Sequence, residues 1–144
     1  MSGPVTTYHN PQAKAFAWSY SKLKNYEVCP KRHFHVDIAK DFKEDESEQL
    51  RYGNYVHKEL AKAIEANSQL PENIRDLQKW VEKVVTSPGK ILVEQQLAIL
   101  RDYSPCPWFD KKTWYRGIGD VIKIVGDVAL IIDWKTGKIV EDSV

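Results

Sequence analysis

Residues 117–138 have the sequence GIGDVIKIVGDVALIIDWKTGK, and this stretch decides the fold of the chain. Two runs rich in Val and Ile lie on either side of Gly126-Asp127, and a Gly-Asp pair in this setting predicts a two-residue hairpin turn. Counting back from the turn along both strands places Asp120 directly opposite Asp133, with their Cβ atoms roughly 5 Å apart. The stretch therefore predicts an antiparallel hairpin that begins and ends with facing carboxylates.

Facing carboxylates repel each other unless a cation lies between them. Lys135 follows Asp133 by two residues, so it extends to the same face of the strand. The apolar residues 129–132 before Asp133 predict a strand buried on both faces, where a carboxylate needs a partner or a metal ion. Mg²⁺ is usually held by one or two carboxylates, so the pair predicts a metal site. The alternative is a surface ion pair between Asp133 and Lys135, worth less than about 1 kcal/mol.

The composition is that of one globular domain of 144 residues, with 28% charged and 42% hydrophobic residues. No stretch approaches the roughly 20 apolar residues of a membrane span, and no signal-peptide pattern is visible, so we expect no membrane partner. Two distant cysteines, Cys29 and Cys106, exclude a disulfide framework and a complete structural zinc site and favour a reducing, cytoplasmic compartment. The net charge is only +1, but residues 11–40 hold six Lys/Arg against two acids, so the charge is segregated.

Apolar spacing and turn residues divide the chain into helices followed by strands, an order that predicts an α+β fold with helices flanking a sheet. The expected elements, in chain order, are a poorly ordered lead-in over 1–17, a short helix over about 22–28 capped by Ser19 or Ser21, a second helix from Pro30 with Phe34, Ile38 and Ala39 on one face, a loop over 41–48, helices over 50–67 and 74–84, a strand over 90–100 and a loop over 103–112.

Two further residues are candidates for the same chemistry. His57 lies on the apolar stripe of the helix over 50–67, so it faces the core or a cleft. It is either a buried histidine bonded to the backbone or a metal ligand. Glu94 interrupts an apolar strand, and it either points to solvent from an edge or adds a third carboxylate to the face of Asp120 and Asp133. The order of the strands decides this, and the sequence does not give it.

Residues 18–34 mix aromatic side chains with Lys and Arg, a composition that suits single-stranded nucleic acid through phosphate attraction and base stacking. The alternative is that the aromatics anchor the core and the lysines form a solvated face. The loop at 136–138 lacks the remainder of a Walker-type motif, which disfavours nucleotide hydrolysis. The candidates for nucleic-acid contact are Ser21, Lys22, Lys24, Tyr26, Lys31, Arg32, Thr136 and Lys138.

These pieces occur in an order that resembles the RecB-like nucleases of the PD-(D/E)XK superfamily, over residues 18–138. The opening motif lies at 19–23 and 29–34, the G-x-x-x-H motif at 53–57, the G-x-x-D motif at 117–120 and the D-x-K-T-G motif at 133–137.

The resemblance implies a restriction-endonuclease-like core, an α/β/α sandwich-like fold in which helices flank a mixed central β-sheet. It also implies Mg²⁺ or Mn²⁺ as the cofactor. The implied roles are metal binding by His57, Asp120, Asp133 and the backbone carbonyl of Trp134, a less secure ligand in Glu94, and a Lys135 that orients or helps to deprotonate the attacking water. Asp120, Asp133 and Lys135 are then the catalytic residues.

The implied activity is metal-dependent hydrolysis of DNA, as linear duplex or single strand, by an exonuclease of recombination, repair or phage replication. The alternative is an inactive DNA-binding or assembly module. Relatives continue past D-x-K-T-G into a helix, whereas only residues 138–144 follow here. We therefore expect a nuclease domain over 18–144 that is a fragment of a longer chain, a minimal nuclease, or a domain completed by a second copy or a partner subunit. Cys29 matches one cysteine of the iron–sulfur cluster of some relatives, but the other three have no counterpart, so no cluster is expected.

Overall fold

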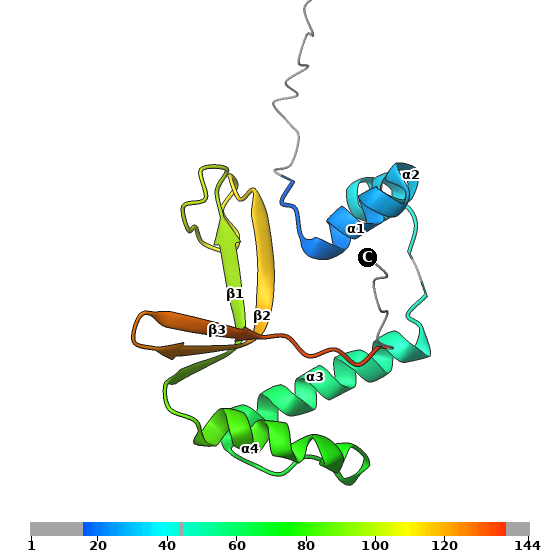
Figure 1. Cartoon of the computed structure of the whole chain (residues 1–144). Helices are drawn as coiled ribbons and strands as arrows, with labels where there is room; N and C mark the ends of the chain where they lie inside the picture. Colours follow the sequence, from blue (N-terminus) through cyan, green and yellow to red (C-terminus); the bar gives the residue numbers. More distant parts are fainter. Residues whose placement is uncertain (1–15, 44, 138–144) are drawn as a thin grey trace, which may run out of the picture.

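The structure, a computed structural model, describes residues 16–43 and 45–137, and it confirms the α+β class (Figure 1). Helices come first along the chain, and three strands follow them. The elements are α1 (Tyr20–Val28), α2 (Pro30–His33), the π-helical segment η1 (Phe34–Ala39), α3 (Glu48–Ala66), the 3-10 segment η2 (Glu72–Leu77), α4 (Gln78–Thr86), β1 (Lys90–Ile99), β2 (Tyr115–Val125) and β3 (Val128–Ile132).

The predicted hairpin is confirmed. The three strands pair antiparallel in the order β1-β2-β3, and the β2–β3 ladder runs from Val125 opposite Val128 to Val121 opposite Ile132. Gly126 in the turn has a φ of +56°, a conformation that glycine adopts without steric cost. A parallel bridge between Trp18 and Tyr115 joins the segment before α1 to the start of β2.

The sheet bends where β1 and β2 carry their acidic residues. Glu94 in β1 has a φ of +48°, unusual for a strand residue other than glycine, and it interrupts the register between neighbouring pairs. A Cβ atom added to Gly119 in β2 would lie 3.2 Å from the Ile122 side chain, although residues three apart in a straight strand are about 10 Å apart. The β2–β3 hairpin therefore extends crosswise to the part of the sheet in which residues 95–99 of β1 pair with residues 115–119 of β2 (Figure 1).

The core lies between the sheet and the two helices below it, α3 and α4. The predicted apolar stripes of both helices are buried, and Val121 of β2 is completely covered by them. Ser47 caps α3 by accepting a hydrogen bond from the Leu50 N–H, so the residues described before Glu48 form a loop, as expected. The buried core residues are Val56, Leu60, Ala63, Ile64, Leu70, Ile74, Val81, Val84 and Val121.

The N-terminal helices form a smaller unit around His33. This histidine is 4% exposed, it stacks on Trp18 with ring centroids 5.2 Å apart, and its Nδ1 lies 2.9 Å from the Asp37 carboxylate. In the structure Phe34 and Ile38, which the sequence placed on one face of the second helix, are both about half exposed and form no buried stripe. The reason is that the π-helical winding of η1 breaks the 3.6-residue repeat on which that stripe depends.

The prediction that the strand before Asp133 is buried on both faces is wrong. Val128, Leu130 and Ile131 of β3 are 69%, 58% and 63% exposed. Among the strands that the structure describes, β3 pairs with β2 alone, so it forms an edge of the sheet and its apolar side chains lack a second neighbouring strand. In the described part of the chain, no helix has the length and apolar character needed to cross a membrane.

Candidate metal centre

Three side chains from three different elements converge above the bend in the sheet. His57 comes from α3, Glu94 from β1 and Asp120 from β2, and each offers one ligand atom within 4.8 Å of the other two. The sequence left open whether Glu94 points to solvent or lies on the face of Asp120. In the structure its carboxylate lies beside Asp120 and His57.

Local structure explains why these residues meet. Glu94 lies opposite Asp120 between two ladder pairs of β1 and β2, so their side chains start from neighbouring positions. Val56 and Leu60 of α3 are buried in the core, and this orientation of the helix directs the His57 side chain, which lies between them in the sequence, toward the sheet. The His57 side chain is 31% exposed and that of Asp120 is 10% exposed, so the cluster lies at the rim of the core and remains open to a ligand.

Asp120 is the most connected member of the cluster. Its Oδ2 accepts a hydrogen bond of 2.7 Å from the Trp134 backbone N–H and lies 3.4 Å from His57 Nδ1. The first of these bonds ties the segment after β3 to the centre of the sheet. Asp120 therefore lies against the histidine ring and fixes the chain that carries Asp133 and Lys135.

Two carboxylates this close leave an excess of negative charge. Partial burial, and then the nearby charge of Asp120, raise the pKa of the Glu94 carboxyl above its ordinary value, and His57 offsets only part of this. A divalent cation between the two carboxylates would relieve the repulsion, because each would then face an opposite charge.

Asp133 and Lys135 form a separate ion pair. Lys135 Nζ lies 2.5 Å from Asp133 Oδ2, and their side chains are 78% and 52% exposed. The hydrogen bond to Asp133 raises the pKa of the Lys135 ammonium. This is the geometry of the surface-pair alternative. Within the described residues, the three-member cluster does not include Asp133, although the register would place it opposite Asp120 one residue past the last ladder pair.

The cluster has nearly the dimensions of a metal site. Ligands on opposite sides of Mg²⁺ lie about 4.2 Å apart, since each is about 2.1 Å from the ion. The span of 4.8 Å exceeds this by about 0.6 Å, a shift that side-chain rotation can supply. Two carboxylates and an imidazole are therefore suitable donors for a divalent cation, with room for oxygens from Asp133, Trp134 or a substrate.

The residues expected to contact nucleic acid lie in different settings. Lys22 and Ser21 line a groove that also contains Asp133 and Lys135, whereas Lys24 pairs with Glu27 at 3.0 Å and Tyr26 packs edge-on against Trp18. Thr136 lines a second, more apolar hollow between α3, α4 and the hairpin. Lys138 lies outside the described residues.

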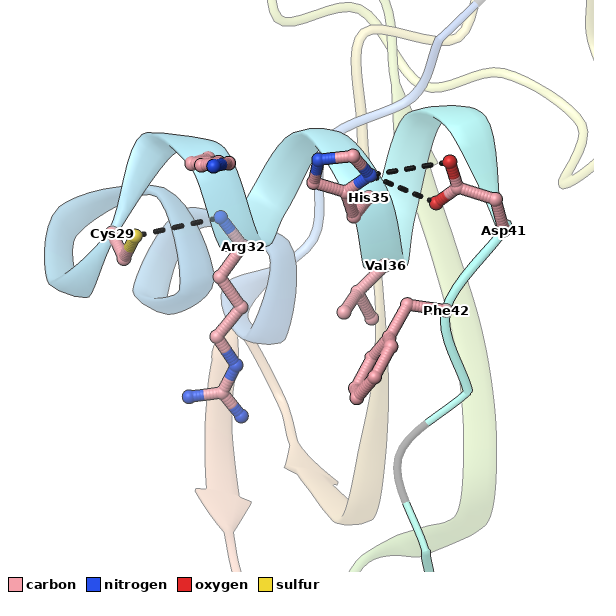
Figure 2. Close-up of a pocket in the computed structure, with 7 residues that line it drawn as sticks. Cys29, Arg32, His35, Val36, Asp41 and Phe42 are labelled. Atoms are coloured by element: carbon pink, nitrogen blue, oxygen red, sulfur yellow. Dashed lines mark hydrogen bonds and ion pairs between the residues drawn. The ribbon is translucent and has the colours of Figure 1, made fainter.

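Lys31 and Arg32 line a third hollow of about 540 Å³ on the N-terminal helices. Figure 2 shows Arg32 and Phe42 extending on the same side of this unit, while His35 Nδ1 bonds to both carboxylate oxygens of Asp41, at 3.0 and 3.2 Å. Cys29 accepts a hydrogen bond from the Arg32 N–H there, so it caps α2. None of these lining residues belongs to the His57, Glu94 and Asp120 cluster.

Sequence reasoning gave no role to two residues that shape the centre. A Cβ atom on Gly53 would lie 3.0 Å from Thr136 Oγ1, so this glycine lets the segment after Trp134 approach α3. Lys123 is buried, and its Nζ donates to the carbonyls of Val84 and Ser87, which holds the end of α4 against β2. The G-x-x-x-H spacing was a signal for the first, and a lysine within an apolar strand was a signal for the second.

Comparison with known proteins identifies the class. A family model described as the PD-(D/E)XK nuclease superfamily matches residues 17–143, and the chain belongs to this superfamily. Searches of curated proteins and of solved structures found no match. Members of the superfamily are in general metal-dependent nucleases that act on nucleic acid, and the His57, Glu94 and Asp120 cluster supports such an activity for this chain.

Proposed function

We propose that this protein is a DNA nuclease of the RecB-like type that uses Mg²⁺ or Mn²⁺ to hydrolyse phosphodiester bonds. The observation that carries the proposal is the convergence of His57, Glu94 and Asp120 from three elements, beside a D-x-K motif. The order of the four motifs supports the RecB-like assignment.

His57, Glu94 and Asp120 would hold the cation, and Asp133 and the Trp134 carbonyl would complete its shell. A bound cation supplies Lewis-acid polarisation of the scissile phosphate and lowers the pKa of water. In the chain itself, Asp120 holds the Trp134 backbone, so it positions the D-x-K motif beside the phosphate. The positions of His57 and Glu94 on two packed elements fix the site rigidly.

Lys135 serves as a cation and hydrogen-bond donor in this mechanism. The hydrogen bond to Asp133 raises the pKa of the Lys135 ammonium. As a cation, Lys135 would orient the attacking water and balance developing negative charge. The exposed side chain can turn from Asp133 toward a substrate.

The donor set suits Mn²⁺ better than Mg²⁺. Mg²⁺ strongly prefers oxygen ligands and keeps several waters. Mn²⁺, a transition-metal ion, accepts the nitrogen ligand of the His57 imidazole more readily than Mg²⁺ does. We infer that Mn²⁺ supports activity at lower concentration than Mg²⁺.

The resemblance to RecB-like enzymes supports exonuclease action on linear DNA, in recombination, repair or phage replication. A specific observation favours the alternative of an inactive DNA-binding or assembly module. Asp133 is paired with Lys135 and lies apart from the cluster. An active enzyme must bring this carboxylate to the metal.

The proposal is tested with a linear plasmid and the covalently closed circle of the same sequence, in Mn²⁺, Mg²⁺ or EDTA. We expect the linear form to be degraded only with metal and the circle to survive. Lys135→Met should lower the rate by about 10²–10³-fold, because it removes a charge that acts on the transition state.

The control for this assay is Asp76→Ala, which changes an exposed carboxylate of η2 and should keep the wild-type rate. Binding without cleavage under every condition would favour the inactive module. Equal rates for Lys135→Met and the wild type would contradict the proposed site, and rapid cutting of the closed circle would contradict exonuclease action.

A further inference from the structure

A groove of about 790 Å³ leads away from the Asp133–Lys135 pair, and its outer part has no role in the mechanism above. We call it the α1–β2 groove. Residues 19–22 at the start of α1 form one wall, and Trp108 with residues 115–118 of β2 forms the other. Backbone bonds between Trp18 and its partners Trp114 and Arg116 hold the two walls together, so the groove is part of the folded structure.

Two cations, Lys22 and Arg116, line this groove. Lys22 donates to the Ala17 carbonyl at 2.7 Å, and Arg116 donates to the Trp108 carbonyl at 3.3 Å. In the part of the chain that the structure describes, no carboxylate forms a salt bridge with either. Burial, and then the charge of Arg116, lower the pKa of Lys22, and the charge of Asp37 offsets only part of this, so Lys22 and Arg116 repel each other. An anion bound between them would remove this repulsion.

Most donors of both side chains remain available for such an anion. Arg116 has five side-chain N–H groups and Lys22 has three, and each side chain makes one hydrogen bond to a carbonyl, while the Lys22 ammonium also lies over the Phe16 ring at 4.3 Å from its centroid. A guanidinium recognises the paired oxygens of a phosphate better than any other side chain, because its donors form a planar fork.

Aromatic surface lies directly beside these cations. The Arg116 guanidinium stacks over the Trp108 ring at 5.1 Å from its centroid, and the Tyr20 ring on the opposite wall is 64% exposed. A cation placed beside aromatic faces is the combination that binds single-stranded nucleic acid, since bases stack on the rings while phosphates contact the charge.

We propose that the α1–β2 groove binds a single strand of DNA and guides it to the Asp133–Lys135 pair, with Arg116 and Lys22 contacting phosphates and Trp108 stacking on an unpaired base. This rests on the proposed function, and it adds a preference. Bases in a duplex are already stacked and paired, so they cannot use Trp108. The protein therefore binds a single strand, or a frayed end, more tightly than a blunt duplex.

The test is fluorescence anisotropy with a labelled dT20 strand and a blunt 20-base-pair duplex. The full chain is kept in EDTA, so that no cleavage occurs. We expect tighter binding of dT20. Arg116→Gln should weaken it by about tenfold and reduce the salt dependence by about 0.7 of a logarithmic unit per decade, the share of one phosphate contact. Trp108→Leu should weaken dT20 binding by a similar factor and leave the salt dependence unchanged.

Lys111→Gln is the matched control, because it removes an exposed charge from the same loop outside the groove, and it should bind like the wild type. If Arg116→Gln disturbs the loop, Trp108→Leu still tests the groove, because it changes a different lining residue. Melting curves verify the fold of each variant.

Unchanged dT20 binding in both groove variants would overturn the proposal, as would equal binding of strand and duplex. The outcome that would contradict the proposed nuclease activity is different from the outcomes that would contradict the groove. A wild type that binds dT20 through this groove but never cleaves DNA with Mn²⁺ would contradict the activity and leave the groove assignment standing.

Discussion

Asp120 interacts with three other residues at the candidate metal centre. It accepts a hydrogen bond from the Trp134 N–H and lies 3.4 Å from Nδ1 of His57, and its charge adds to the effect of burial in raising the pKa of Glu94. At the scale of single residues, a turn and a helical stripe placed Asp120 and His57 by local rules, and the structure brings their side chains to 3.4 Å from each other, whereas the cluster does not include Asp133. Glu94 was left open, because its direction depends on which strand pairs with which, a contact between distant segments.

Glu94 makes the metal-free centre sensitive to pH. A carboxyl with a raised pKa binds its proton more readily in the folded state, so the free energy of unfolding falls as the pH rises from 4.5 through the raised value. In EDTA at pH 7, Glu94→Gln should therefore be more stable than the wild type, by less than about 1 kcal/mol because the group is exposed. Thermal melting between pH 4 and pH 8 measures the difference, which should vanish at the acidic end.

In Mn²⁺ the wild type should be more stable than Glu94→Gln, because the ion binds the folded wild type through the Glu94 carboxylate, which the variant lacks. Glu72→Gln, at an exposed glutamate of η2, controls for the loss of one negative charge. A Glu94→Gln protein less stable than the wild type in EDTA at neutral pH would show that Glu94 is not under repulsion from Asp120.

At the scale of elements, β2 contributes more than the register of the hairpin. Its bend at Gly119 turns the hairpin crosswise, and Lys123 anchors the end of α4. The sequence predicted the strands and the helices α3 and α4, because their apolar repeats are strong. It did not predict the π-helical turns of η1 or the exposure of β3, since both depend on how neighbouring segments pack.

Replacing Lys123 tests the anchor between α4 and β2. Lys123→Met keeps the apolar stem but removes the donor to the carbonyls of Val84 and Ser87. We expect the free energy of unfolding to fall by about 1–3 kcal/mol, because buried carbonyls lose a charged partner. Urea unfolding measures the loss. Lys90→Met, at an exposed position of β1, should change stability by less than about 0.5 kcal/mol, and a similarly small effect of Lys123→Met would contradict the anchoring role.

At the scale of the whole molecule, two helical units meet one bent sheet. The unit of α3 and α4 covers the sheet and contributes His57, while the N-terminal unit is joined to the start of β2 and forms one wall of the α1–β2 groove. The order of motifs along the chain predicted the superfamily. The groove was not predicted, because Trp108 and Arg116 belong to no motif and meet residues 19–22 only in the folded chain.

The central claim is that His57, Glu94 and Asp120 hold a divalent cation. Its most direct test is a Mn²⁺ titration in which electron paramagnetic resonance reports the free ion, for the wild type and for Asp120→Asn. The substitution keeps an oxygen that can accept the Trp134 N–H, so the fold is preserved while the ligand charge is lost. Asp127→Asn at the exposed hairpin turn is the control. We predict about one tightly bound Mn²⁺ per chain in the wild type and the control, and affinity reduced about 10–100-fold or more in Asp120→Asn. Equal Mn²⁺ binding by all three proteins, or none by the wild type, would contradict the assignment of this cluster as the metal centre.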